Sequence, residues 1–458
     1  MRTPSLFSLS SGLMLALAAA CGTSSGGAVD AHGGSGSNGD ATPDGGGVPP
    51  RIIAGGGIGD GPITGVANVY VIDDASRQPV AGAAVTVGTV TGVTDATGLF
   101  VATGVTGKQT VLVTAGSYRG ELWVGANGAN LTVDLQPANA ATPGSATLTG
   151  SVDLSSFSVA VGHQKTASVT YSQDELATDA ANNLDQGGAN TCSVGAVAIT
   201  QSCGFTVTSR TGHVALIAAV FDHDPKTADP TDDTFTLIGW AQRPSLVVAN
   251  GVAQTGQDLA VVTTADTVTE KVAFAPPPTS LPLVAGIIGI DLGPDGVLEL
   301  PSILTSSPGE LVVPKLSVFA TGTYRLSGVA KASAADDSPT SVVFVRAQTG
   351  TQLTAPDWLL PSTNASVTRA TASWTAVDNA TVQGIEYAAG ATQLLSATSF
   401  DGTTTIDIPA AAGLPATGAL TAKITAIEAL GLDVNNFGLD ADRAKITAVA
   451  AAPTQVAN

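Results

Sequence analysis

The sequence is poor in the side chains on which most enzymes and nucleic-acid binders depend. Its 458 residues include four histidines and three cysteines, and only 4% of them are aromatic. Eighteen lysines and arginines stand against 37 aspartates and glutamates, for a net charge of −19. Nucleic-acid binding needs basic side chains that neutralise phosphates, so we expect no nucleic-acid partner. So few cysteines also exclude a domain held together mainly by disulfides.

Small and aliphatic residues are abundant instead. Hydrophobic residues make up 44% of the chain, there are 53 glycines, and charged residues are only 12%. This composition excludes a coiled coil and a highly charged disordered chain. The length allows about two to four domains of about 100–200 residues each.

The N-terminus has the pattern of an export signal. Met1 and Arg2 give a short positive start, and an apolar stretch follows from Leu6 to Ala20. That stretch is shorter than the roughly 20 residues of a transmembrane helix, and it is typical of a signal-peptide core. Small residues end it, directly before Cys21.

The segment Leu17-Ala18-Ala19-Ala20-Cys21 resembles the lipobox of bacterial lipoproteins. The resemblance implies that residues 1–20 are removed and that Cys21 carries the lipid that binds the membrane. Gly22 is not the acidic residue linked to inner-membrane retention, so we expect an outer-membrane lipoprotein of the cell envelope. An ordinary secretory signal followed by a chance cysteine is the alternative. Residues 21–62 are rich in Gly, Ser and Asp, which predicts a disordered tether.

Residues 63–137 alternate apolar and polar side chains between turn signals, a pattern typical of a β-sandwich. Three pieces, residues 79–87, 94–100 and 115–118, resemble the carboxypeptidase regulatory-like domain. The resemblance implies a small transthyretin-like sandwich with an accessory, non-catalytic role.

The remaining chain predicts further β-domains. Residues 146–265 are expected to form a sandwich of unknown type, because the apolar run at 214–221 indicates a buried strand. Residues 279–353 predict another β-rich domain. Residues 355–452 resemble a fibronectin type III domain, with Trp374 and Tyr387 at the positions of its core aromatics. The predicted fold class is therefore all-β, with tandem β-sandwich domains after a signal peptide and a tether.

Two features of residues 146–265 involve chemistry. With Cys21 assigned to lipid, Cys192 and Cys203 remain, and the oxidising compartment favours a disulfide between them. A reactive or metal-binding pair is the alternative. The loop after the buried strand contains five carboxylates that suit Ca²⁺, the one cofactor the sequence suggests: Asp222, Asp224, Asp229, Asp232 and Asp233. A solvated turn explains the same residues without a metal.

These patterns favour a lipid-anchored, non-enzymatic envelope protein, whose sandwiches act as a stalk or as a binding or adhesion module for a glycan or an envelope protein. One alternative is a hydrolase with catalytic residues in 146–353, which requires a cleft around Asp222, Asp224 or His223. The other is a carbohydrate-binding lipoprotein, which requires an exposed aromatic platform. Its candidate residues are Trp123, Trp240, Trp358 and Trp374.

Overall fold

Strands make up nearly all of the regular structure, which confirms the all-β prediction. The computed structural model describes residues 48–458 apart from residues 75, 140–143, 173–190, 227–232, 264–265, 305–306, 320–321, 336 and 458. Its α-helix α2 (Leu439–Asp442) has a single turn. Nowhere in these residues is a helix long and apolar enough to cross a membrane. The predicted signal peptide, residues 1–20, and Cys21 lie outside the described residues.

Module 1 is a sandwich of two sheets. Its strands are β1 (Gly57–Gly59), β2 (Thr64–Asp73), β3 (Ala84–Val87), β4 (Val90–Val93), β5 (Leu99–Thr106), β6 (Gln109–Thr114), β7 (Gly120–Ala126) and β8 (Asn130–Leu135). One sheet has the order β1-β8-β2-β5 and the other β7-β6-β3-β4. Alternate residues such as Val69 and Val71 in β2 and Val85 in β3 fill one core between the sheets.

Module 2 is a second sandwich. Its strands are β9 (Ser145–Asp153), β10 (Gln164–Tyr171), β11 (Thr191–Gly195), β12 (Ser202–Arg210), β13 (Gly212–Asp224), β14 (Thr234–Val248) and β15 (Ala260–Thr263). The sheet β11-β10-β13-β14-β15 packs on the pair β12-β9. The predicted disulfide is confirmed: Cys192 in β11 and Cys203 in β12 are joined by an S–S bond of 2.02 Å. It therefore connects the two sheets.

Modules 3 and 4 complete the chain. Module 3 contains β16 (Thr267–Ala273), β17 (Leu283–Asp291), β18 (Val297–Leu304), β19 (Gly309–Pro314), β20 (Thr323–Lys331), β21 (Thr340–Gln348) and β22 (Gln352–Thr354). Module 4 contains β23 (Ser366–Val367), β24 (Thr371–Ser373), β25 (Val382–Ala389), β26 (Thr392–Ser399), β27 (Thr405–Asp407), β28 (Thr421–Ala429), β29 (Phe437–Gly438), β30 (Ile446–Ala451) and β31 (Gln455–Val456). Trp374 and Tyr387 lie in the core of module 4.

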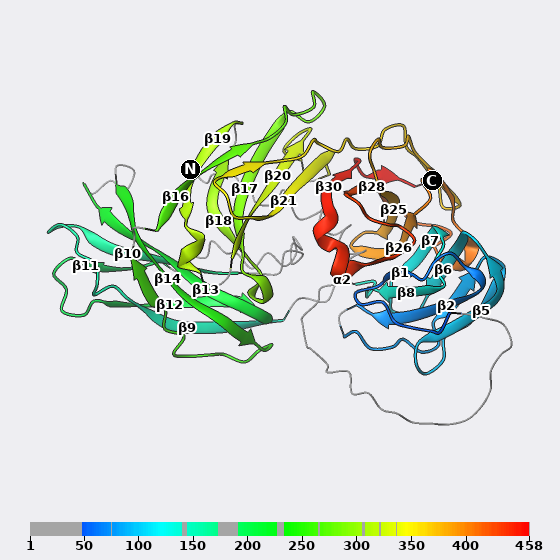
Figure 1. Cartoon of the computed structure of the whole chain (residues 1–458), viewed down its shortest axis with the longest axis horizontal. Helices are drawn as coiled ribbons and strands as arrows, with labels where there is room; N and C mark the ends of the chain where they lie inside the picture. The colour runs from blue at the N-terminus through cyan, green and yellow to red at the C-terminus, as the bar shows by residue number, and fades with distance from the viewer. Residues whose placement is uncertain are drawn as a thin grey trace.

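One sheet passes through three of the modules. β21 of module 3 pairs with β30 of module 4, and β26 of module 4 pairs in parallel with β7 of module 1. The result is a thirteen-stranded sheet in which module 4 lies between modules 3 and 1, although module 1 comes first in the chain (Figure 1). β29 also pairs with β1, so both sheets of module 1 are extended by strands of module 4.

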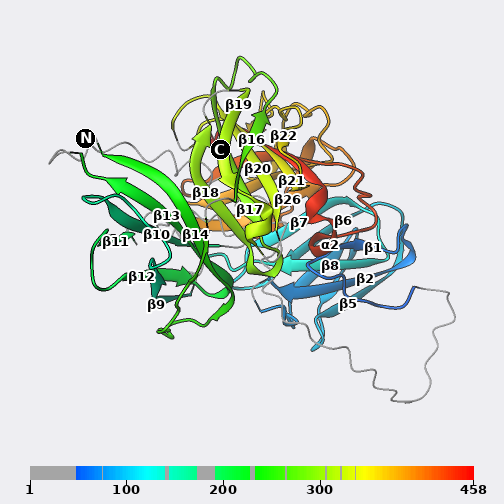
Figure 2. The same cartoon turned by 60° about the vertical axis from the view of Figure 1, so that its left-hand side comes forward.

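Module 2 packs against module 3 and extends away from module 1. Ile217 and Trp240 of module 2 belong to the same hydrophobic core as Leu292 and Leu298 of module 3. In both views of the molecule, module 2 lies on the side opposite module 1 (Figure 2). The free end of module 2 is thus the part of the fold farthest from the N-terminal sandwich.

The disulfide predicts a measurable contribution to stability. Replacing both cysteines (Cys192→Ser with Cys203→Ser) should lower the free energy of unfolding by about 2–3 kcal/mol, because the unfolded chain regains the freedom of an open loop. Urea unfolding measures the change. A reducing agent should destabilise the wild-type protein equally and leave the double variant unaffected. Equal stability of the wild type and the double variant would contradict the prediction.

Candidate functional site

The acidic residues expected in a loop lie partly in a strand: Asp222 and Asp224 are the end of β13, and Asp233 directly precedes β14. Asp222 Oδ1 lies 2.8 Å from His163 Nδ1, and Asp224 Oδ1 lies 3.5 Å from the other nitrogen of the same ring. His223 Nε2 lies 2.7 Å from Asp233 Oδ2. Asp229 and Asp232 fall outside the described residues. In the part of the chain that the structure describes, no group of three or more His, Cys, Asp or Glu is placed to hold a metal ion. Calcium binding here stays a prediction.

The three residues around which the hydrolase alternative expected a cleft do not lie on one face of β13. Successive residues of a strand point to opposite faces, so His223 points away from the side of Asp222 and Asp224. Its ring stacks on Phe235, with centroids 4.4 Å apart, and it contacts Asp233 instead. The carbohydrate-binding alternative meets a direct correction, because all four tryptophans are buried, with exposures of 5–8%. They fill cores and cannot form the expected platform.

The free end of module 2 carries exposed aliphatic side chains, and we call it the tip. It consists of loop 154–163 between β9 and β10 and loop 196–201 between β11 and β12, joined by a hydrogen bond from Ala196 N to His163 O (3.2 Å). Val161, Val197 and Ile199 are 87%, 80% and 103% exposed. The disulfide lies at the base of the second loop. These loops therefore hold apolar side chains in water on a constrained backbone.

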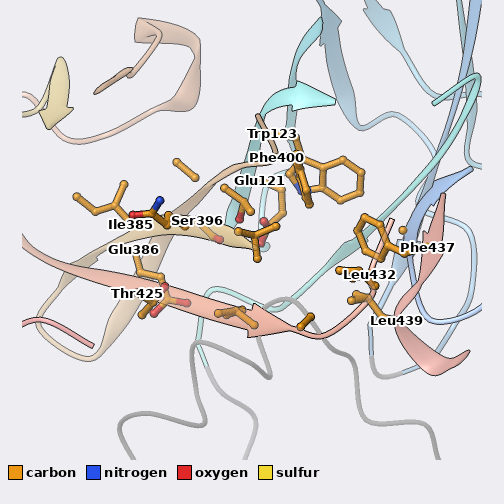
Figure 3. A pocket seen from close by; sticks show the side chains of 18 of the residues that line it. Glu121, Trp123, Ile385, Glu386, Ser396, Phe400, Thr425, Leu432, Phe437 and Leu439 are labelled. Carbon is orange, nitrogen blue, oxygen red and sulfur yellow. The ribbon is translucent and has the colours of Figure 1, made fainter. Parts of the chain in front are cut away.

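A cavity of about 80 Å³ lies where module 1 meets module 4. Figure 3 shows Glu121 and Trp123 of β7 on one wall, Glu386 of β25 on another, and Phe437 with the nearby apolar side chains at the far end. The complete lining is Gly57, Glu121, Trp123, Asp134, Val382, Gln383, Gly384, Ile385, Glu386, Ser396, Ala397, Thr398, Phe400, Thr425, Ile427, Ala429, Leu432, Phe437, Leu439 and Ile446.

A buried ion-pair network stands behind the polar wall. Arg119 is fully buried; its Nη2 donates to Glu121 Oε1 at 2.6 Å, and its Nη1 donates to Gln393 Oε1 at 3.0 Å. Glu386 Oε1 is 3.5 Å from the same Nη1. Because Glu386 and Gln393 belong to module 4, the arginine of module 1 connects the two modules as well as neutralising part of the acidic wall.

Burial changes the acidity of this wall. Desolvation raises the pKa of Glu121 to about 7, and the guanidinium of Arg119 opposes this shift without overcoming it. Desolvation also raises the pKa of Asp134 well above its usual value, and the negative charge of Asp74 acts in the same direction. Asp134 is 3% exposed, and its Oδ2 has no hydrogen-bond partner. The wall thus includes a buried acceptor that the protein leaves unused.

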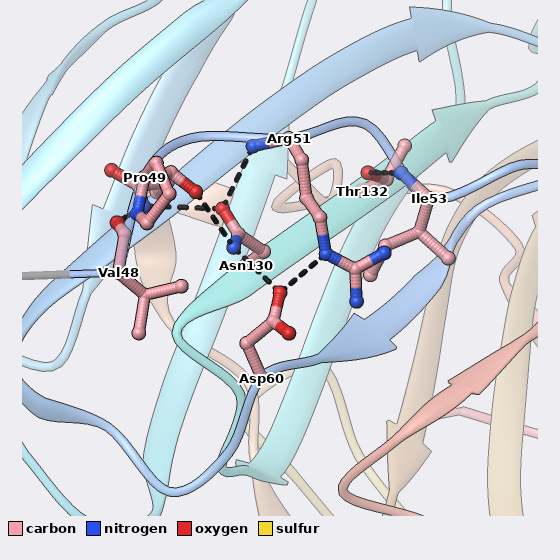
Figure 4. Close-up of polar contacts among 8 residues, drawn as sticks. Val48, Pro49, Arg51, Ile53, Asp60, Asn130 and Thr132 are labelled. Carbon is pink, nitrogen blue, oxygen red and sulfur yellow. Dashed lines mark hydrogen bonds and ion pairs between the residues drawn. The ribbon is translucent and has the colours of Figure 1, made fainter.

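The segment that leads into module 1 lies along β8 as an ordered strap, residues 48–56. Arg51 N donates to Asn130 Oδ1 (3.1 Å), and Asn130 Nδ2 donates to Pro49 O (3.2 Å). Ile53 N donates to Thr132 Oγ1 at 2.9 Å. Figure 4 shows this row of contacts, with Asp60 bonded to both Asn130 and Arg51 (Figure 4). The strap continues into β1, where Gly57 lines the cavity.

The strap corrects the predicted tether. Residues 48–62, which we expected to be disordered with the rest of 21–62, are bound to module 1 and include strand β1. The strap is hydrogen-bonded to the polar face of β8. Asn130, Thr132 and Asp134 form the polar face of β8, and all three are buried. The sequence shows a strand with one polar and one apolar face. That pattern does not reveal the strap, because it is equally typical of a strand whose polar face is exposed to water.

Comparison with known proteins leaves the family open. The chain matches no family model and no curated protein sequence. Among solved structures, the Bacillus anthracis TIE protein is 9% identical over 64% of this chain and 50% of that one, with a TM-score of 0.13. This chain thus spans half of that protein's length.

Two further matches are adhesin structures. A Ca²⁺-stabilized adhesin that helps an Antarctic bacterium reach out and bind ice is 12% identical, covering 86% of this chain and 99% of that one, with a TM-score of 0.15. A tetra-tandem repeat in the extending region of a large adhesion protein is 11% identical with the same coverage and a TM-score of 0.12. Likeness at this level is too slight to assign a function.

The buried carboxyl groups predict that stability depends on pH. Because the folded pKa of Glu121 is raised to about 7 from 4.5, the folded state binds the proton more tightly than the unfolded state. The free energy of unfolding should therefore fall as pH rises from 4.5 to 7, by on the order of 1–3 kcal/mol. Glu121→Gln should flatten this decline in urea unfolding at each pH. The exposed control Glu310→Gln should keep the decline, and an equal slope in both variants would overturn the assignment.

Proposed function

We propose that the protein is a lipid-anchored, non-enzymatic binding module of the cell envelope, which attaches through the tip of module 2 to a protein partner. The tip is the observation that carries the proposal. Exposed aliphatic side chains are common singly, but here three stand on two loops that a hydrogen bond joins, and water covers their apolar area unfavourably. A partner that buries them recovers that free energy.

The chemistry of the tip favours a protein over a glycan. Sugar rings pack on aromatic side chains, and the tryptophans are buried. Val161, Val197 and Ile199 suit an apolar pocket. Asp222 and Asp224, which contact His163 of the same loops, lie beside them and suit a basic rim around that pocket.

The placement of the modules supports attachment at opposite ends of the molecule. The strap enters at β1 and β8 of module 1, whereas the tip is the free end of module 2, on the other side in both views. A stalk would need the modules in a row. Here the first module pairs with the last through β7 and β26, so we favour the binding module over the stalk. The predicted tether would supply the reach.

Lipid attachment at Cys21 is tested by fractionation. Full-length protein expressed in a Gram-negative bacterium with a labelled fatty acid should carry the label and sediment with outer membranes. Cys21→Ser should lose the label and be released, because it removes the acylated thiol. The variant Cys192→Ser with Cys203→Ser is the matched control and should remain labelled. Label retained on Cys21→Ser would refute the anchor.

The tip is tested separately by binding. Changing Val161, Val197 and Ile199 together to serine should weaken binding of the full chain to isolated envelope protein fractions at least tenfold, because the contact loses its apolar core. The melting temperature should stay the same, since all three side chains are exposed.

Serine substitutions at Val312 and Leu430, exposed at 63% and 74% outside the tip, are the matched controls and should bind as wild type. Equal binding by the tip variant and the control variants would overturn the proposal. So would turnover of a substrate by a wild-type protein that binds no envelope fraction.

A further inference from the structure

The cavity between modules 1 and 4 presents carboxyl groups without a lining cation. Glu121, Asp134 and Glu386 are the charged residues among the described side chains that line it. The basic groups that face this cluster are Arg119, which bonds to Glu121, and Lys423, which acts on Glu386; neither lines the cavity. Arg77 lies close enough to act on Asp134, but it is paired with Asp74. Compensation therefore comes from outside the cavity, and the charged surface inside it is acidic.

One of these carboxyl groups is unsatisfied. Asp134 is only 3% exposed, and its Oδ2 has no hydrogen-bond partner. Glu121, in contrast, is hydrogen-bonded to Arg119. Buried acceptors without partners are rare in folded proteins, because water no longer compensates them. Asp134 belongs to the residues that line the cavity, so a donor bound there could satisfy it.

Apolar and aromatic side chains line the rest of the cavity, beginning beside Glu121. Trp123 and Phe400 pack edge to face with ring centroids 5.5 Å apart, and Phe400 lies 5.7 Å from Phe437. Figure 3 places Leu432 and Leu439 beside Phe437, away from Glu386. An apolar chain is favoured there, and the electron-rich face of an aromatic ring tolerates a nearby cation.

We propose that this cavity binds a short alkylammonium ion, whose ammonium group donates to Asp134 and Glu121 and whose alkyl chain lies against Trp123 and Phe400. The cavity of about 80 Å³ is smaller than the roughly 150 Å³ of an apolar cavity that binds benzene, which suits a ligand of only a few heavy atoms. A metal ion is disfavoured, because the described residues gather no group of three acidic, histidine or cysteine ligands. The site is independent of the lipid anchor and of the tip.

Thermal unfolding of the full chain tests the site, with n-butylammonium chloride compared against sodium chloride at equal ionic strength and against 1-butanol. Butylammonium should raise the melting temperature by several degrees, because it binds only the folded state, and the two comparison solutes should not. An equal shift with 1-butanol, or no shift with butylammonium, would overturn the proposal. N-acetyl-lysine N-methylamide carries the same butylammonium group on a peptide-like backbone. If it binds more tightly than n-butylammonium, the site is assigned to a lysine side chain of a partner protein. If it binds more weakly, the site is assigned to a free amine.

Variants separate binding from structure. Asp134→Asn should reduce the affinity for butylammonium at least tenfold by calorimetry, while the ligand-free protein melts at the same or a higher temperature, because a buried carboxyl group with an unpartnered oxygen is replaced. Glu386→Gln, at the edge of the wall with 16% of its side chain exposed, should weaken binding severalfold and serves if the first variant misfolds. Asp295→Asn, a buried carboxyl bonded to Ser245 outside the cavity, is the matched control and should bind as wild type. Unchanged affinity in both Asp134→Asn and Glu386→Gln would overturn the site.

Discussion

The parallel pairing of β7 with β26 is the contact on which the arrangement of the molecule depends. Leu395 lies opposite Gly120 and Ser399 opposite Val124, so the edge of the first sandwich is extended by a strand of the last. An unpaired edge invites aggregation, and this pairing covers it on both modules at once. It also fixes module 4 against module 1, which creates the cavity and brings Arg119 to Glu386.

Charge is buried at this junction where apolar packing alone would have been simpler. A fully buried arginine is costly unless every partner is in place, and here the partners come from two modules. The network therefore stabilises the one relative placement of modules 1 and 4 in which all partners of Arg119 are in position. Burying charge at this junction raises the pKa of Glu121 and leaves Asp134 Oδ2 without a hydrogen-bond partner. Both residues line the cavity.

Local features of the fold could be predicted from sequence, and contacts between modules could not. Alternation in residues 63–137 indicated a sandwich, whose core contains Val69 and Val71, and the cysteine count indicated the disulfide. The pairing of β7 with β26 joins strands far apart in the chain, and no periodicity marks which edges meet. Asn130 is buried because the strap covers it, and its polar side chain alone gives no sign of this burial. The cavity forms where the paired modules and the strap that leads into β1 meet, and no sequence pattern marks it.

The strap has a mechanical consequence. If the chain is held by lipid at one end and by a partner at the tip, tension enters the folded body at the strap. Before that load reaches strand β1, it meets the hydrogen bonds of Asn130 and Thr132, and β1 itself is held between β8 and β29. The force is thus shared between the first and last modules at its point of entry. Tension on the tether would therefore strain two sandwiches together.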